Sequence, residues 1–205
     1  MFGECFTPHP VLLFAMELVA RRRPSSILDP SPGNGIFLAS LAQVSSAKSL
    51  GLIQGASELE KAKLLEPAPE VVWRMGDALQ LLENVEEHFD AVVSNLPFGT
   101  GQRPLSMSRN GSIVEVKDEL GGLILLKSAL KLSPKGAAIF VVSNSFFFRS
   151  NENSVRHVLP CFGLRLAGCF SIPAGRFQAN DFYRRRPTRD RTRLLHRRVC
   201  GRVVW

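Results

Sequence analysis

Short apolar runs alternate along the chain with segments whose apolar residues recur every three to four positions. The apolar runs predict six strands, over residues 25–30, 50–57, 71–77, 89–95, 137–144 and 166–173. The periodic segments predict helices over residues 11–20, 36–46, 58–66, 78–87 and 121–131. Strands that are apolar on both faces and alternate with helices are typical of a mostly parallel sheet covered on each side. We therefore expect a doubly wound α/β fold.

One long segment, residues 99–120, shows neither period. It follows directly on the most distinctive motif of the chain, where a functional loop is expected. Arg103 and Arg109 within it are candidates for contacts with phosphate groups.

Length and composition allow one hydrophobic core. The chain has 205 residues, of which 45% are hydrophobic, and this leaves little room for a second folded domain. It contains no run of eighteen apolar residues, and no basic segment precedes its first apolar stretch, so we expect a cytoplasmic protein without a membrane span. The four cysteines and four histidines show no metal-ligand spacing, so no metal site is predicted.

The net charge of +8 comes from the end of the chain. Residues 184–205 contain nine arginines, no lysine and one acidic residue, whereas the preceding residues carry equal numbers of basic and acidic side chains. The charge therefore gives no reason to expect a basic surface on the body of the protein.

A turn that can hold a ligand follows the first predicted strand. The strand ends at Asp29 and Pro30, and the chain turns through Gly33 and Gly35 into a helix. In an open parallel sheet such a turn lines the usual ligand crevice, and glycines let the backbone approach a ligand closely. A tight turn without a ligand is equally consistent with this sequence. The dinucleotide fingerprint is not met, since Leu38 occupies its third glycine position.

The strongest motif, Asn95-Leu96-Pro97-Phe98, ends the fourth predicted strand. An amide oxygen and a backbone carbonyl at a strand end can hold an exocyclic amine in line with a methyl donor, and an aromatic ring can stack on an extruded base. Asn95 and Phe98 supply these groups, and Pro97 stiffens the turn. The alternative is an ordinary Asn-to-Pro turn whose phenylalanine joins the core.

Six segments in order resemble the catalytic domain of adenine-specific DNA methyltransferases of restriction-modification systems, including type I modification subunits. They read FTPHPVLLFAMELV, ILDPSPGNGIFLASLA, VVWRMGDAL, FDAVVSNLPFG, LILLKSALKLSPKGAAIFVVSNSFF and VRHVLPCFGLRLAGCFSIPAGRF. The resemblance covers about 177 residues. It implies a class I, Rossmann-like methyltransferase fold with S-adenosylmethionine as the cofactor.

The resemblance also assigns roles to individual residues. Thr7 and Pro8 would border the methionine end of the cofactor, and Asp77 would hydrogen-bond its adenine. Asn95, Pro97 and Phe98 would form the catalytic element, with Asn95 also near the cofactor. The cradle of the cofactor would consist of Asp29, Pro30, Gly33 and Gly35.

Two positions depart from the family pattern. Leu96 replaces the first proline of the Asn-Pro-Pro-aromatic element, in a version that resembles ribosomal RNA adenine dimethylases, and this keeps RNA open as a substrate. Family members also place an acidic residue at the end of the second strand to bind the ribose hydroxyls. Alignment puts Ser57 there with Glu58 beside it, so Glu58 would take this role or cofactor affinity would be reduced.

Three functions follow as alternatives. The first is methyl transfer to the exocyclic amine of adenine in DNA, with DNA and a specificity or endonuclease subunit as partners and with no membrane and no metal. The second is the same chemistry on RNA adenine or on a protein glutamine. The third is an inactive, truncated gene product whose basic tail binds nucleic acid without specificity.

The resemblance divides the chain into a catalytic domain over residues 1–177 and an arginine-rich, irregular tail over residues 178–205, without a target-recognition domain. In the family a last strand runs antiparallel between the fifth and sixth strands, and the tail offers no apolar run of that length. We therefore expect an incomplete last strand and a change of reading frame between residues 177 and 184. The alternative is that the tail is a basic arm that grips phosphate.

Overall fold

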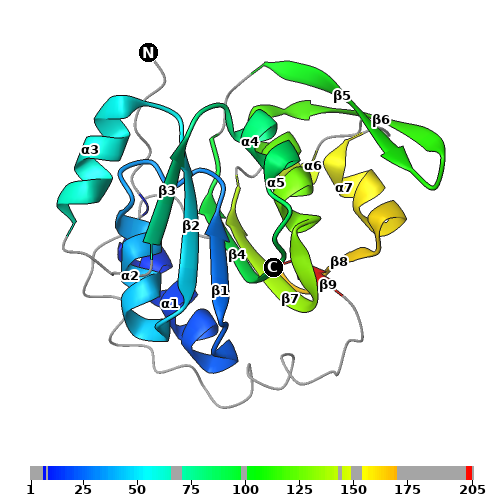
Figure 1. Ribbon diagram of the computed structural model, residues 1–205. Coiled ribbons are helices and arrows are strands. Elements are labelled where there is room, and N and C mark those ends of the chain that lie inside the picture. Colours follow the sequence, from blue (N-terminus) through cyan, green and yellow to red (C-terminus); the bar gives the residue numbers. More distant parts are fainter. Residues whose placement is uncertain are drawn as a thin grey trace.

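Seven strands form one parallel sheet in the order β3-β2-β1-β4-β7-β9-β8 (Figure 1). The computed structural model describes residues 7, 9–65, 71–97, 101–142, 145–148, 154–169 and 202–204. The strands are β1 (Ser26–Asp29), β2 (Lys48–Ile53), β3 (Val71–Met75), β4 (Phe89–Asn95), β7 (Leu132–Val141), β8 (Leu164–Leu166) and β9 (Arg202–Val204). The predicted doubly wound α/β fold is confirmed.

Helices cover both faces of the sheet. They are α1 (His9–Arg22), α2 (Ile36–Ser45), α3 (Ala56–Leu64), α4 (Ala78–Asn84), α5 (Leu120–Ala129), α6 (Ser145–Phe148), α7 (Val155–Val158) and the 3-10 helix η1 (Leu159–Phe162). The five predicted helices and the first five predicted strands are all present, with ends shifted by a few residues. Within the described part of the chain, no helix is long and apolar enough to span a membrane.

The central strand β4 explains why its sequence is apolar throughout. Successive side chains of a strand point to opposite faces of the sheet. Ala91 and Val93 pack with α1 and α2 on one face, and Val92 packs with α4 and α5 on the other. Both faces are covered, so each residue from Ala91 to Val93 is buried.

The segment predicted as an unpatterned loop is instead a β-hairpin, and that prediction was wrong. Strands β5 (Gln102–Arg109) and β6 (Ser112–Glu119) pair antiparallel over eight residues each. Asn110 and Gly111 form the turn, both with positive φ (49° and 79°), as a two-residue hairpin turn requires. The pair Asn-Gly between two strands was the sequence signal, and the alternation of Met107, Val114 and Val116 with polar residues supported it.

Two further predictions are corrected at the far end of the sheet. β8 begins at Leu164, directly after the left-handed turn at Gly163, so it overlaps the predicted strand 166–173 only at its last residue. The last strand was expected to be incomplete, and a strand of three residues, Arg202–Val204, pairs with both β7 and β8. This strand fills the expected place with three residues and runs parallel to its neighbours, not antiparallel.

Candidate cofactor and catalytic site

Two of the predicted site residues, Asp29 and Asn95, lie where the strand order reverses. β1 lies between β2 and β4, and the chain leaves β1 toward β2 on one side and later returns to β4 on the other. At such a switch point the loops after the two strands separate and leave a crevice at their carboxyl ends. Asp29 ends β1 and Asn95 ends β4, so both lie at this edge.

Register brings the two strand ends together. Leu28 of β1 lies opposite Val92 of β4, so Asp29 is level with Val93 and Ser94 lies one residue further along. Ser94 Oγ donates a hydrogen bond to Asp29 Oδ1 at 2.7 Å. The turn predicted to hold the cofactor and the strand that bears the predicted catalytic motif are therefore joined by a direct contact between side chains.

Asp29 is a buried carboxylate that uses only one of its oxygens within the described part of the chain. Asp29 is 1% exposed. Oδ1 accepts hydrogen bonds from Ser94 Oγ and from the backbone N–H of Ser31, whereas Oδ2 is buried without a hydrogen-bond partner. Burial raises the pKa of the Asp29 carboxyl to about 7, although both hydrogen bonds lower it.

The turn after Asp29 depends on its glycines. Gly35 is the N-cap of α2 with φ of 83°, and a Cβ there would lie 2.8 Å from Ala62 Cβ on α3. A side chain at this position would push α3 away from the turn. Gly33 also has positive φ (56°), but the space around its Cα is open. Backbone that is exposed and lacks a side chain can be approached closely by a ligand.

The predicted catalytic motif contacts both β7 and α5. Leu96 is 1% exposed, and its N–H donates to the carbonyl of Val141 at 3.2 Å. A Cβ on Gly121, in the first turn of α5, would lie 2.2 Å from the carbonyl oxygen of Pro97. This close approach fixes the backbone of the motif, and sequence reasoning missed Gly121. Phe98 lies outside the described residues, so its predicted stacking role stays a prediction.

Asp77 follows β3 at the same edge of the sheet. It is the N-cap of α4, and its Oδ1 accepts from the N–H of Gln80 at 3.0 Å. The side chain is exposed, and one carboxylate oxygen suffices for the cap.

The predicted ribose position needs a correction. β2 ends at Ile53, and Ser57 is the second residue of α3, so Ser57 does not end the second strand. The carboxylate of Glu58 lies close to the start of α3, since a Cβ placed on Gly55 would lie 2.3 Å from Glu58 Oε2. Gly55 is the N-cap of α3, two residues after β2, so the carboxylate of Glu58 lies near the end of that strand.

The first predicted contacts lie ahead of α1. Thr7 is partly exposed and lies two residues before the first residue of the helix. Pro8 lies outside the described residues. The roles of both residues beside the methionine end of a cofactor stay predictions.

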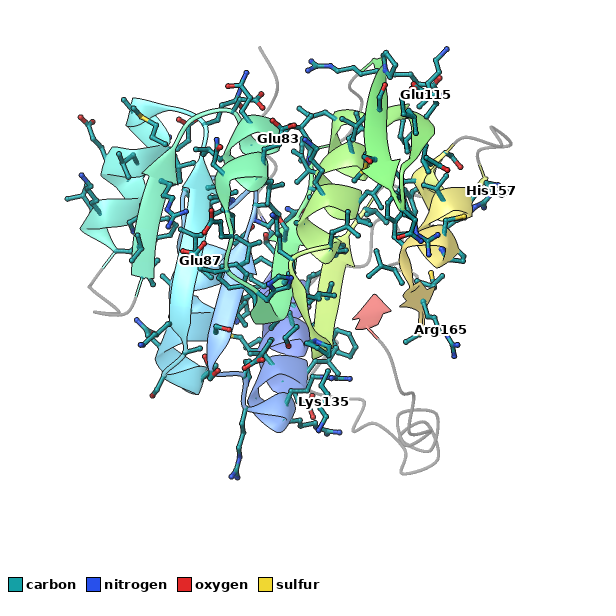
Figure 2. The ribbon with its side chains drawn as sticks, turned by 45° about the vertical axis from the view of Figure 1, so that its right-hand side comes forward. Glu83, Glu87, Glu115, Lys135, His157 and Arg165 are labelled. Atoms are coloured by element: carbon teal, nitrogen blue, oxygen red, sulfur yellow. The ribbon has the colours of Figure 1, made fainter. Side chains whose placement is uncertain are left out.

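The hairpin lies at the end of the molecule where the parallel strands end (Figure 2). It begins at Gln102, soon after the Asn95 to Phe98 motif, and Figure 2 places Glu115 of the hairpin at the opposite end of the molecule from Lys135, which lies in the first half of β7. Arg103 is exposed, and the guanidinium of Arg109 lies 5.7 Å from the ring centroid of Phe162. Their predicted contacts with phosphate are not tested by these positions.

Buried Asp118 anchors the base of the hairpin. Its carboxylate accepts hydrogen bonds from the N–H of Glu119 and from the N–H of Val155 at the start of α7. The hairpin, α5 and α7 thus meet at one side chain.

Comparison with known proteins gives distant but consistent matches. No protein-family model matches the sequence. The type II methyltransferases M.HincII and M.HindII of Haemophilus influenzae are each 24% identical over 169 residues, which cover 77% of this chain and 31% and 30% of theirs. The methyltransferase subunit of a type I restriction-modification system from Streptococcus thermophilus superposes with a TM-score of 0.64 at 18% identity, over 81% of this chain and 41% of that one. The chain resembles the methyltransferases of restriction-modification systems.

This chain has the fold of class I S-adenosylmethionine-dependent methyltransferases. A structure described as a putative enzyme of that class from Listeria monocytogenes superposes with a TM-score of 0.56 at 18% identity, over 72% of this chain and 49% of that one. The chain spans about a third of the length of the curated relatives that it matches.

Proposed function

We propose that this chain is the catalytic part of an S-adenosylmethionine-dependent methyltransferase that acts on the exocyclic amine of adenine in DNA. The observation that carries the proposal is the hydrogen-bonded junction between the turn after β1 and the strand end that bears Asn95. It brings a candidate cofactor cradle and a candidate amine-binding motif to one crevice. The resemblance to restriction-modification enzymes favours DNA.

The residues at the crevice fit the cofactor. The buried, unused oxygen of Asp29 can accept from the ammonium of its methionine part, and the open backbone at Gly33 leaves room beside it. Glu58, near the end of β2, is suited to the ribose hydroxyls, and Asp77, after β3, to the adenine amine. The order along the sheet edge supports an extended cofactor across β1, β2 and β3.

Catalysis would rest on the Asn95 motif. The bound cofactor supplies an electrophilic methyl group, and no metal is needed for the transfer. The amine of adenine is a poor nucleophile because its lone pair is delocalised into the ring. Acceptance of its hydrogens by the Asn95 amide oxygen and a backbone carbonyl of the motif would favour the pyramidal nitrogen of the transition state. Phe98 would stack on the extruded base.

The test is transfer of a labelled methyl group, followed by digestion and identification of the methylated nucleoside. The parent protein should label adenine in DNA of mixed sequence, and Asn95→Ala should remove the activity while cofactor binding persists. Asn84→Ala is the matched control, since Asn84 is an exposed amide at the end of α4. Label on cytosine, or equal labelling by Asn95→Ala, would contradict the assignment.

Leu96 makes RNA the second substrate to test. Labelling of RNA adenine in place of DNA adenine would keep the chemistry and change the substrate, and labelling of a glutamine-containing peptide would do the same for protein. A parent protein that binds the cofactor but labels none of these would favour an inactive gene product. The domain boundary near residue 177 and the change of reading frame ahead of the arginine-rich segment stay predictions.

A further inference from the structure

A serine that the motif reasoning did not single out lies at the junction of the two halves of the site. Ser94 is 0% exposed and precedes Asn95 directly in β4. Its hydroxyl donates to Asp29 Oδ1 at 2.7 Å. Asn95 follows in the same strand and is paired with Val141 of β7, so a displacement of Ser94 would carry Asn95 with it.

We propose that Ser94 is a positioning residue, whose hydroxyl keeps the Asp29 carboxylate oriented and ionised for the cofactor and thereby couples cofactor binding to the placement of Asn95. This inference rests on the proposed function, because it requires the cofactor at Asp29. It adds a residue and a pH dependence that the proposed function does not contain.

The hydrogen-bonding pattern of Asp29 gives the physical reason. An ionised carboxylate accepts hydrogen bonds at both oxygens, but Oδ2 is buried and has no partner in the described part of the chain. The ionised form therefore depends on the two donors at Oδ1, Ser94 Oγ and Ser31 N. A cationic ammonium placed at Oδ2 would stabilise the same form. Ser94 and the cofactor thus act on one ionisation equilibrium.

Among the described residues, no other ionisable side chain forms a hydrogen bond or an ion pair with Asp29. The turn after β1 and α2 contain none, and β2 and β4 carry theirs, Lys48 and Asp90, at the opposite ends of the strands. The shift of the Asp29 pKa has burial as its main cause, with the two hydrogen bonds opposing it. The other charged or titratable groups on neighbouring elements are exposed or contact residues other than Asp29. On α1, His9 and the Glu17–Arg21 pair are exposed. Glu58 lies against Gly55, Asp77 caps α4, and Lys127 pairs with Glu83.

The experiment measures S-adenosylmethionine affinity by calorimetry from pH 5.5 to pH 9.5. For the parent protein the affinity should fall about tenfold per pH unit below a midpoint near 7, because the cofactor must displace a proton from Asp29. In Ser94→Ala the midpoint should rise by about one to two pH units, the size expected when a hydrogen bond to a charged group is lost. At pH 7 that variant should bind about five- to fifty-fold more weakly than the parent. Near pH 9.5 the ratio of the two affinities should approach one, since deprotonation of the cofactor's amino group lowers both equally.

Matched variants separate positioning from packing. Ser94→Thr keeps a hydroxyl and should keep the parent midpoint. Ser49→Ala removes another buried hydroxyl, which donates to the carbonyl of Ala47 and not to Asp29, and should also leave the midpoint unchanged. Ser94→Gly is a second hydroxyl-free variant that should match Ser94→Ala, and it replaces that variant if the latter does not fold.

Two outcomes would overturn different parts of the account. One outcome is that the parent binds and the hydroxyl-free variants keep its midpoint, so that their affinity is lowered equally at every pH or is unchanged. In that case Ser94 does not support the ionised form of Asp29. If the parent does not bind S-adenosylmethionine at any pH, the proposed function fails and the role of Ser94 fails with it.

Discussion

Replacing Asp29 by asparagine should remove a loss of stability that the parent protein shows as the pH rises to neutral. The carboxyl has a pKa of about 7 in the folded protein and an ordinary value of 3.8 outside it. Between these values the folded state binds a proton that the unfolded state has released. The contribution of Asp29 to the free energy of unfolding is therefore fully present below pH 3.8 and is lost as the pH rises to about 7. The shift corresponds to about 4 kcal/mol in total, of which about 2 kcal/mol is lost between pH 5 and pH 7 and about 3 kcal/mol between pH 5 and pH 8.

Asparagine cannot ionise, so this loss should be absent from the Asp29→Asn variant. Urea unfolding at pH 5 and pH 8 gives the free energy of unfolding of both proteins. The variant should gain about 3 kcal/mol relative to the parent between these two pH values. Any cost of burying the amide N–H is the same at both pH values and cancels from the comparison.

Asp90→Asn is the control for this experiment. Hydrogen bonds from Ser25 and Ser133 lower the pKa of Asp90, so its carboxyl is ionised in both states from pH 5 to pH 8. Its effect on stability should therefore be independent of pH in that range. A difference between Asp29→Asn and the parent that is equal at pH 5 and pH 8 would refute the reasoning about Asp29.

Three further predictions concern the motif, the cofactor and the tail. Gly121→Ala should lower methyl transfer and leave cofactor affinity unchanged, because its Cβ would meet the Pro97 carbonyl. Gly101→Ala, with open space around it, is the control, and normal turnover by Gly121→Ala would count against the role given to that contact. Asp77→Ala should weaken cofactor binding in calorimetry and lower the free energy of unfolding by about 1 kcal/mol, because the N-cap of α4 is lost, whereas Asp77→Asn should keep the cap. Unchanged cofactor affinity in both variants would refute the adenine contact. Deletion of residues 184–205 should leave cofactor affinity unchanged, because the described part of that segment, β9, pairs with β7 and β8, away from β1; a loss measured by calorimetry would mean that the tail acts on the site.

The central strand was predictable because its surroundings are uniform. β4 is apolar from Ala91 to Val93 and is covered on both faces, so its bounds agree with the predicted range of 89–95. The hairpin was missed because Asp118 interrupts the apolar side chains of its inner face and Ile113 interrupts the polar side chains of its outer face, which weakens the two-residue period. The Asn110-Gly111 turn was the local signal that remained.

The candidate site was predictable residue by residue but not in its contacts. Asp29 and Asn95 could be placed at strand ends from the sequence alone. The hydrogen bond between Ser94 and Asp29 depends on the register between β1 and β4, which brings together residues 65 positions apart. Glu58 shows the same limit, since the position of its carboxylate depends on how α3 begins after β2.

The most direct test of the central claim is a calorimetric titration of the parent protein and of Asp29→Asn with S-adenosylmethionine at pH 8. The account predicts that the parent binds one cofactor per chain and that Asp29→Asn, while folded, binds far more weakly, because a neutral amide cannot form an ion pair with the ammonium. Absence of binding by the parent, or equal affinity of the two proteins, would contradict the proposed site between β1 and β4.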